Sequence, residues 1–290
     1  MTVELILAEA DLTEFTVRPL GGGTYNSVFR VTSPEGDFVL KVSPSDQRGL
    51  TYERNLVRTE ALFCRLGHAV APVPEVVHTD FSRALVNSDA LLTTWLPGRP
   101  LLGRDDVDRP LVRRQLGRAV AALHEVTGPG FGYPQLGLHP TWTSAFFAMV
   151  GAVQADARRF GVALPEIPLD PAVFDDVTRP ALVHFDLWDG NILTETGTGL
   201  TGLVDGERAF WGDPVAEFVS PALFRTIEDD QDFLTSYGFE FTDSARVRLA
   251  AYQAYLYSIM LVERVPRGST DAATEALITD ALARALDVLA

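Results

Sequence analysis

Residues 182–193, LVHFDLWDGNIL, bring a histidine, two aspartates and an asparagine into one short loop. His184, Asp186 and Asn191 have the spacing H-x-D-x-x-x-x-N, and Asp205 follows Asn191 by fourteen residues. An aspartate near a hydroxyl group can orient it and accept its proton. An asparagine oxygen and a second aspartate suit Mg²⁺, which takes further ligands from water and phosphates. The pattern predicts a general base beside a magnesium site, although Asp and Asn also tie ordinary loops.

Asp186 and Asp205 each follow a short apolar run that is typical of a buried strand. The run is ALV before His184 and GLV before Asp205. We therefore expect two adjacent strands to aim Asp186 and Asp205 at one point. The chain also contains a single lysine, Lys41, among 24 basic residues. A bias toward arginine explains why lysine is rare, but not why the exception lies in the apolar strand pattern DFVLKVS, where an unpaired ammonium is unfavourable. Lys41 is therefore predicted to be functional.

A glycine-rich turn, GGGTYNS, lies upstream of Lys41 between two strand patterns. Glycine lets backbone N–H groups approach a ligand closely, and asparagine tolerates a positive φ. The turn fits a clamp over phosphates, but the motif alone favours an ordinary flexible β-turn. The residues concerned are Gly22, Gly23, Thr24, Tyr25 and Asn26.

Four other kinds of site are excluded by their patterns. A Walker A loop needs a lysine directly after glycine at the start of a helix, and Lys41 follows a leucine in a strand. The G-x-G-x-x-G match at residues 197–202 joins two strands and reads as a hairpin turn. A zinc site at His184 and Asp186 would need a third and a fourth ligand, and the sequence offers none at a suitable spacing. A serine hydrolase would need a G-x-S-x-G nucleophile elbow, and the sequence contains none.

The periodicity divides the chain into a small β-rich part, residues 1–96, and a larger helical part, residues 97–290. Strand, turn and strand patterns over residues 15–43 predict an antiparallel meander, and a helix pattern follows that ends at Gly67. Two more strands and a PGRPL turn complete the first part. Four amphipathic helices follow, interrupted only by the strand patterns around residues 181–214. This α+β organisation places function where the two parts meet.

Composition limits the partners. A net charge of -15 argues against nucleic acid and is compatible with a cationic substrate, although acidity also keeps a protein soluble. The sequence contains no run of eighteen apolar residues, so no membrane span is predicted. The N-terminus lacks the features of a signal peptide. The single cysteine, Cys64, cannot form an internal disulfide, so we expect a cytoplasmic location. Oligomeric state leaves no sign in the sequence.

These motifs resemble those of the protein-kinase-like superfamily, and specifically the aminoglycoside phosphotransferase and fructosamine kinase group. LVHFDLWDGNIL is similar to the group's catalytic loop, GLVDGERAFWGDPVAEFV to its metal-binding segment and FVLKV to its nucleotide-lysine strand. LTTWLPG is similar to its interlobe linker and LGRAVAALHEV to its first large-lobe helix. The resemblance implies a bilobal fold, with an antiparallel β-rich N-lobe that has one main helix, and a mostly helical C-lobe.

The resemblance also implies roles. Asp186 would be the catalytic base, Asn191 and Asp205 the Mg²⁺ ligands, and Lys41 the residue that holds the α- and β-phosphates of ATP or GTP. A helix glutamate would position Lys41, and Glu60 fits better than Glu53. The glycine-rich turn would cover the phosphates. The backbone that would meet the adenine belongs to Thr94, Trp95 and Leu96.

Departures from protein kinases point to a small-molecule acceptor. Phe185 stands where protein kinases have arginine, and Trp188 stands where they have lysine. Arg208 is the candidate for the charge that this lysine would supply. Gly206 and Glu207 follow the metal aspartate, and GDP comes at residues 212–214, which leaves no room for a long activation loop.

The acceptor is less determined. DLWDGN is closer to fructosamine kinases, and DGERAFWGDP to the phosphotransferases. Acidic residues after residue 227 could bind ammonium groups of an aminoglycoside, but the run by itself favours a solvated acidic loop. Trp142, Phe146 and Phe147 could floor a sugar site or belong to the core. The candidate substrate residues are Trp188, Glu207, Arg208, Glu228, Asp229 and Asp230.

The sequence thus predicts a small-molecule kinase that transfers the γ-phosphoryl group of ATP or GTP to a hydroxyl of an aminoglycoside-like or related antibiotic. A ketosamine or another metabolite hydroxyl is the alternative acceptor. A nucleotide-binding pseudokinase is the alternative of another class, and it is disfavoured because Lys41, Asp186, Asn191 and Asp205 are all present.

Overall fold

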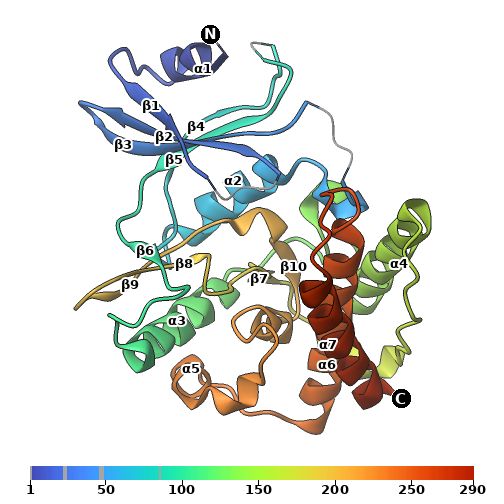
Figure 1. Cartoon of the computed structure of the whole chain (residues 1–290). Coiled ribbons are helices and arrows are strands. Elements are labelled where there is room, and N and C mark those ends of the chain that lie inside the picture. Colours follow the sequence, from blue (N-terminus) through green and yellow to red (C-terminus); the bar gives the residue numbers. More distant parts are fainter. Residues whose placement is uncertain (1, 22–24, 46–48, 85) are drawn as a thin grey trace.

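The computed structural model describes residues 2–21, 25–45, 49–84 and 86–290 (Figure 1). A β-rich N-lobe lies above a larger, mostly helical C-lobe, as in protein kinases. The predicted fold class is therefore confirmed. The predicted boundary after residue 96 falls in the linker between the last N-lobe strand and the first C-lobe strand.

The N-lobe sheet has five antiparallel strands in the order β1-β2-β3-β5-β4. The central strand, β3, pairs with β2 and β5, and Lys41 lies opposite Val28 and Leu91. The first three strands form the predicted meander. Their bounds are β1 Thr16–Pro19, β2 Ser27–Ser33, β3 Gly36–Val42, β4 Val76–Asp80 and β5 Ala90–Thr94.

Alternation along β3 decides which way its side chains point, because successive residues of a strand face opposite sides of the sheet. Leu40 packs with Ile6 and Leu7 of the N-terminal helix α1 (Thr2–Glu9) on one face. Lys41 faces the other side, where helix α2 (Leu56–Gly67) packs through Val57 against Leu91. The single lysine is thereby directed toward α2 and the C-lobe.

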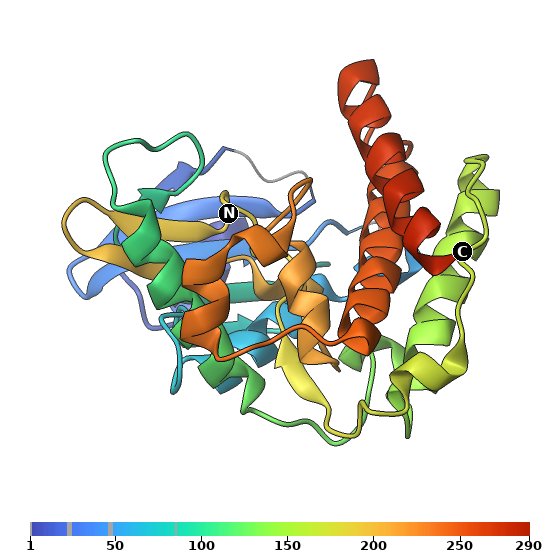
Figure 2. The ribbon, with the colours of Figure 1, turned by 90° about the horizontal axis from the view of Figure 1, so that it is seen from below.

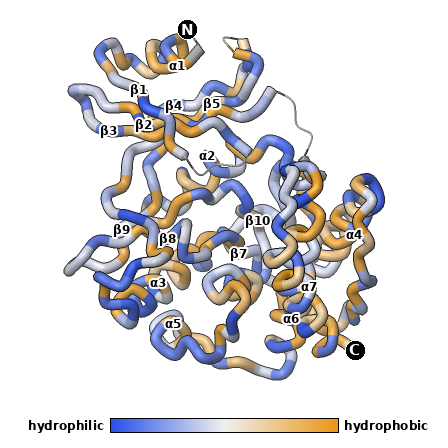
Figure 3. Tube along the Cα trace, in the orientation of Figure 1, coloured by the Kyte–Doolittle hydropathy of each residue, from blue (hydrophilic) through white to orange (hydrophobic). Residues whose placement is uncertain are grey.

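The C-lobe is built on five helices that the structure describes: α3 Arg109–His124, α4 Trp142–Phe160, α5 Gln231–Tyr237, α6 Asp243–Glu263 and α7 Ala272–Leu289. Seen from below, α4, α6 and α7 lie together at one end of the lobe, and α3 and α5 lie at the other (Figure 2). Apolar positions recur along α4, α6 and α7 (Figure 3). None of the helices in the described ranges is long and apolar enough to cross a membrane.

Trp142 and Phe146 are core residues and not a sugar platform. Their exposed fractions are 1% and 0%, and the indole N–H of Trp142 donates to the hydroxyl of Tyr252 at 2.7 Å. That hydroxyl donates in turn to Asp213, which also pairs with Arg248. The aromatic spacing therefore reflects packing between α4 and α6.

The strands of the C-lobe are short: β6 Arg99–Pro100, β7 Ala181–Val183, β8 Ile192–Glu195, β9 Gly199–Leu203 and β10 Phe210–Gly212. The predicted hairpin is β8–β9, with Gly197 in its turn. The PGRPL segment, expected to be a turn, contributes β6, which pairs with β8.

The strands before Asp186 and Asp205, β7 and β9, belong to different sheets, so the expectation that they are adjacent was wrong. β10 folds back along β7 and takes its hydrogen-bonding edge. The ends of β7 and β9 are joined instead by a side chain, since Nε2 of His184 donates to the carbonyl oxygen of Val204 at 3.0 Å.

One N-lobe segment is attached to the C-lobe. The backbone N–H and the hydroxyl of Thr51 donate to Asp156 on α4 at 2.6 and 2.9 Å. Gln135 donates to the carbonyl oxygen of Tyr52 at 2.9 Å. The lobes are therefore connected at this segment as well as through the linker between β5 and β6.

Two helix-interior glycines give a test of the packing. A methyl group at Gly117 on α3 would collide with the carbonyl oxygen of Phe233 on α5, whereas one at Gly151 on α4 would meet nothing within 4 Å. We expect Gly117→Ala to destabilise the fold by about 1–3 kcal/mol through overpacking. Gly151→Ala should stabilise it by about 0.5–1 kcal/mol, because alanine favours a helix over glycine. Urea unfolding of both variants measures the difference, and equal effects would contradict the α3–α5 packing.

Candidate active site

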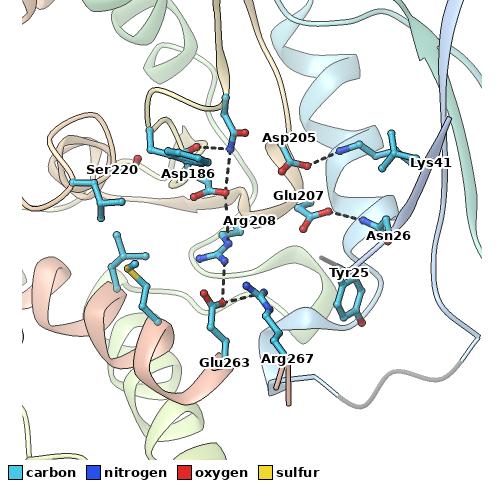
Figure 4. A pocket seen from close by; sticks show the side chains of 16 residues that line it. Tyr25, Asn26, Lys41, Asp186, Asp205, Glu207, Arg208, Ser220, Glu263 and Arg267 are labelled. Carbon is cyan, nitrogen blue, oxygen red and sulfur yellow. Dashed lines mark hydrogen bonds and ion pairs between the residues drawn. The ribbon is translucent and has the colours of Figure 1, made fainter. Parts of the chain in front are cut away.

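A cavity of about 420 Å³ lies between the lobes (Figure 4). It collects side chains from both lobes, including nine of the residues singled out from the sequence. Those nine are Tyr25, Asn26, Lys41, Asp186, Trp188, Asn191, Asp205, Glu207 and Arg208.

Lys41 joins the two lobes through two carboxylates. Its Nζ lies 2.8 Å from Glu60 on α2 and 2.5 Å from Asp205, which follows β9. Burial alone lowers the pKa of Lys41, but the two carboxylates outweigh burial and hold that pKa well above its usual range. Glu60 contacts Lys41 as predicted, whereas Glu53 pairs with Arg267.

A group of carboxylate oxygens lies beside Lys41. Ligand atoms of Glu60, Asp205 and Glu207 all lie within 4.8 Å of one another. Burial and the neighbouring Asp205 raise the pKa of Glu207 well above its usual range. Nδ2 of Asn26, in the glycine-rich turn, donates to Glu207 at 2.7 Å. Such hard oxygen donors fit a divalent cation such as Mg²⁺.

Asp186 and Asn191 face each other across the loop that follows β7. Nδ2 of Asn191 donates to the backbone oxygen of Asp186 at 2.8 Å and to its Oδ2 at 3.1 Å, so Oδ1 of Asn191 takes no part in these bonds. Burial raises the pKa of Asp186 to about 7, and Arg208, 3.8 Å away, opposes the rise. A carboxyl with this pKa is suited to exchange protons near neutral pH.

Glu217 supports this loop from below, and the sequence did not reveal it. Its carboxylate is fully buried and accepts hydrogen bonds from the backbone N–H groups of His184 and Phe185 at 2.6 and 3.0 Å. Phe185 has a φ of 65°, an unfavourable conformation for a residue with a large side chain. The only signal was an acid inside the apolar run PVAEFV, where an unpaired carboxylate is unfavourable.

The other end of the cavity, away from Lys41, has a different chemistry. Arg208 and Arg267 both contact Glu263 at 3.0 Å, and Arg267 also contacts Glu53 at 2.7 Å. The wall beside these charges is formed by Trp188, Ser220, Leu223, Leu256 and Met260.

The acidic run Glu228, Asp229 and Asp230 lies away from the cavity, contrary to the interpretation that it binds the substrate. Glu228 pairs with Arg246 at 2.7 Å and Asp230 with Arg113 at 2.5 Å, and neither these two nor Asp229 lines the cavity. Arginines from other helices form ion pairs with Glu228 and Asp230, and these pairs neutralise the two carboxylates.

One part of the expected nucleotide site does not line the cavity, and another part lies outside the described residues. Thr94, Trp95 and Leu96 lie at the end of β5, where the N–H groups of Thr94 and Trp95 donate to other backbone oxygens. Gly22, Gly23 and Thr24 lie outside the described residues. Their assignment as nucleotide contacts stays a prediction.

Comparison with known proteins agrees with this geometry. The family model described as the phosphotransferase enzyme family matches residues 16–256. The chain belongs to this family. It is therefore a phosphotransferase with a small-molecule hydroxyl acceptor, and the predicted resemblance is confirmed.

Individual relatives differ in their acceptors. The "Probable ketoamine kinase" of Lactiplantibacillus plantarum (strain ATCC BAA-793 / NCIMB 8826 / WCFS1) is 25% identical over 86% of this chain and 89% of its own length. The aminoglycoside phosphotransferase APH(4)-Ia has the same fold, with a TM-score of 0.66 and 20% identity over 99% of this chain and 97% of its own. A thermostable mutant of APH(4)-Ia in complex with ADP and hygromycin B matches with a TM-score of 0.62 and 21% identity over 100% and 98% of the two chains.

The contacts of Lys41 generate a prediction. We expect Lys41→Met to lower kcat/KM for the nucleotide by about 100-fold or more, because the charge predicted to hold the phosphates is lost. Arg246→Met, which removes an exposed cation far from the cavity, is the control and should leave this value within about twofold. Steady-state kinetics with varied nucleotide measure both. Unchanged nucleotide use by Lys41→Met would remove the lysine from the site.

Proposed function

We propose that this phosphotransferase transfers the γ-phosphoryl group of ATP or GTP to a hydroxyl of a ketosamine, a ketose sugar joined to an amine. The observation that carries the proposal is the chemistry of the cavity end away from Lys41. Besides Asp186, which lies 3.8 Å from Arg208, the carboxylate at this end is Glu263, and two arginines hold it; an indole and aliphatic side chains also line the cavity. This lining suits a largely uncharged sugar better than a molecule with several ammonium groups.

The nucleotide is assigned to the Lys41 end. Lys41 would hold the α- and β-phosphates, and Glu60 would keep its ammonium in position. The glycine-rich turn, of which Tyr25 and Asn26 line the cavity, would cover the phosphates. ADP in the related complex supports a purine nucleotide as donor.

Asn191 and Asp205 are the proposed Mg²⁺ ligands, because both line the cavity, Asp205 contacts Lys41, and Oδ1 of Asn191 takes no part in the bonds to Asp186. Glu207 lies close enough to contribute a further oxygen. When bound there, the metal would neutralise charge on the phosphate oxygens.

Asp186 is the proposed general base. Its carboxylate accepts the proton of the acceptor hydroxyl as the oxygen forms a bond to the γ-phosphorus, and the bond to the bridging oxygen breaks to release the nucleoside diphosphate. Arg208, 3.8 Å from Asp186, supplies positive charge where protein kinases place a lysine. Asn191 holds Asp186 in place through its amide.

An aminoglycoside-like antibiotic is the second candidate acceptor. The shared fold with an aminoglycoside phosphotransferase and the net charge of -15 favour it, since an acidic protein attracts cations. The arginines around Glu263 weigh against it.

A screen of acceptors tests the choice. Acceptor-dependent release of ADP or GDP is measured with glycated amines, aminoglycosides, hygromycin B and simple sugars. We expect glycated amines to give the highest kcat/KM. Transfer to an aminoglycoside with a higher kcat/KM than to any glycated amine would replace the first candidate with the second.

The role of Asp186 is tested separately. Asp186→Asn should lower phosphoryl transfer at least about 100-fold, the scale expected when a positioned base is lost, while nucleotide binding persists. Asp229→Asn, in the acidic run outside the cavity, is the matched control and should keep full activity. Turnover assays and calorimetric titration with nucleotide measure the two properties. Wild-type transfer by Asp186→Asn would exclude this residue as the base.

A further inference from the structure

Helix α2 shares its apolar core with the C-lobe. It lies between the N-lobe sheet and the C-lobe (Figure 1), and the apolar cluster that fills the C-lobe includes Leu56, Phe63 and Cys64 of α2. The sheet has a separate apolar cluster, which it forms with α1. Glu60 is thus carried by a helix that is packed into the C-lobe, whereas Lys41 is carried by the sheet.

Gln135 of the C-lobe fastens the start of this helix. It lies in the short turn Pro134–Leu136, and it uses both ends of its amide. Its Nε2 donates to the carbonyl oxygen of Tyr52 at 2.9 Å, and its Oε1 accepts a hydrogen bond from the hydroxyl of Thr59 at 3.0 Å. Thr59 is 3% exposed, so water is a poor alternative partner for its hydroxyl. One amide thereby ties the segment before α2 and the first turn of α2 to the same point of the C-lobe.

The start of α2 gains no support from a side-chain cap. Asn55, its N-cap residue, has a φ of 55°, and its side chain makes no capping hydrogen bond. Farther along the helix, the ring of Phe63 lies edge-on to the ring of His184, with the two centroids 4.9 Å apart. Glu60 lies between these two attachment points, Thr59 and Phe63. Contacts with the C-lobe therefore set the position of its carboxylate.

We propose that Gln135 is a positioning residue for the nucleotide. By fixing the start of α2 it places Glu60, whose carboxylate lies 2.8 Å from Nζ of Lys41. When a metal engages Asp205, Glu60 is the carboxylate that is left to hold Lys41, so its placement affects the nucleotide complex. This inference rests on the proposed role of Lys41 and adds a residue that does not line the cavity.

Variants of the Thr59–Gln135 pair test the inference. Thr59→Val keeps the shape and removes the hydroxyl, Gln135→Met keeps the length and removes the amide, and Thr59→Ser keeps the hydroxyl. We expect Thr59→Val and Gln135→Met each to weaken binding of Mg²⁺-ATP about threefold to tenfold, the scale of one hydrogen bond, and Thr59→Ser to bind like the wild type. Because the two residues form one pair, the double variant should lose less than the product of the two single effects. Isothermal titration calorimetry measures all four.

Kinetics separate positioning from a general loss of structure. With the acceptor that the screen identifies, KM for ATP should rise by a similar factor in Thr59→Val and Gln135→Met, whereas kcat and KM for the acceptor stay within about twofold of the wild type. Gln115→Met is the matched control. Gln115 also uses both ends of its amide, with the backbone of Leu200 and Thr198, and does not line the cavity. This variant should bind Mg²⁺-ATP like the wild type.

The outcomes distinguish this role from the nucleotide site itself. Wild-type binding of Mg²⁺-ATP by both Thr59→Val and Gln135→Met, or equal weakening by Gln115→Met, would overturn the positioning role. If Lys41→Met also binds Mg²⁺-ATP like the wild type, the proposed nucleotide site falls with it. If Lys41→Met alone is impaired, only the role of Gln135 falls.

Discussion

The ammonium group of Lys41 has to be neutralised where it is buried, and this requirement organises the site. Its two partners come from different parts of the chain, Glu60 from the N-lobe helix α2 and Asp205 from the segment after β9 in the C-lobe. A buried charge without partners is strongly unfavourable, so the three groups fix the relative position of the strand, the helix and the metal-binding segment. A nucleotide and a metal bound at the proposed positions would have to replace contacts of this cluster.

The catalytic loop depends on a second set of buried polar contacts. Glu217 binds two consecutive N–H groups of the loop, and His184 ties the loop to Val204, the residue before Asp205. Burial lowers the pKa of His184, so its ring stays neutral and can donate from Nε2. These contacts hold Phe185 in its positive φ and aim Asp186 into the cavity. Asp186 and Asp205 are thereby placed together, although the strands that precede them lie in different sheets.

The sequence predicted the parts that depend on local patterns. Lys41 in an alternating strand and the spacing of Asp186, Asn191 and Asp205 could be read from neighbouring residues, whereas Glu60 was assigned from the resemblance to the kinase family. Contacts between distant segments could not. The pairing of β7 with β10, the support from Glu217 and the contact between Arg208 and Glu263 join residues that are 25 or more positions apart. The acidic run looked available in the sequence because the arginines that neutralise it, such as Arg113 and Arg246, come from other elements.

The account depends most directly on the convergence of Lys41, Asn191 and Asp205 on one metal–nucleotide complex. A crystal structure with Mg²⁺ and a non-hydrolysable ATP analogue measures it. The account predicts metal within coordination distance, about 2.1 Å, of oxygens of Asn191 and Asp205, with Lys41 on the α- and β-phosphates. A nucleotide bound elsewhere, or a metal held without either residue, would contradict it.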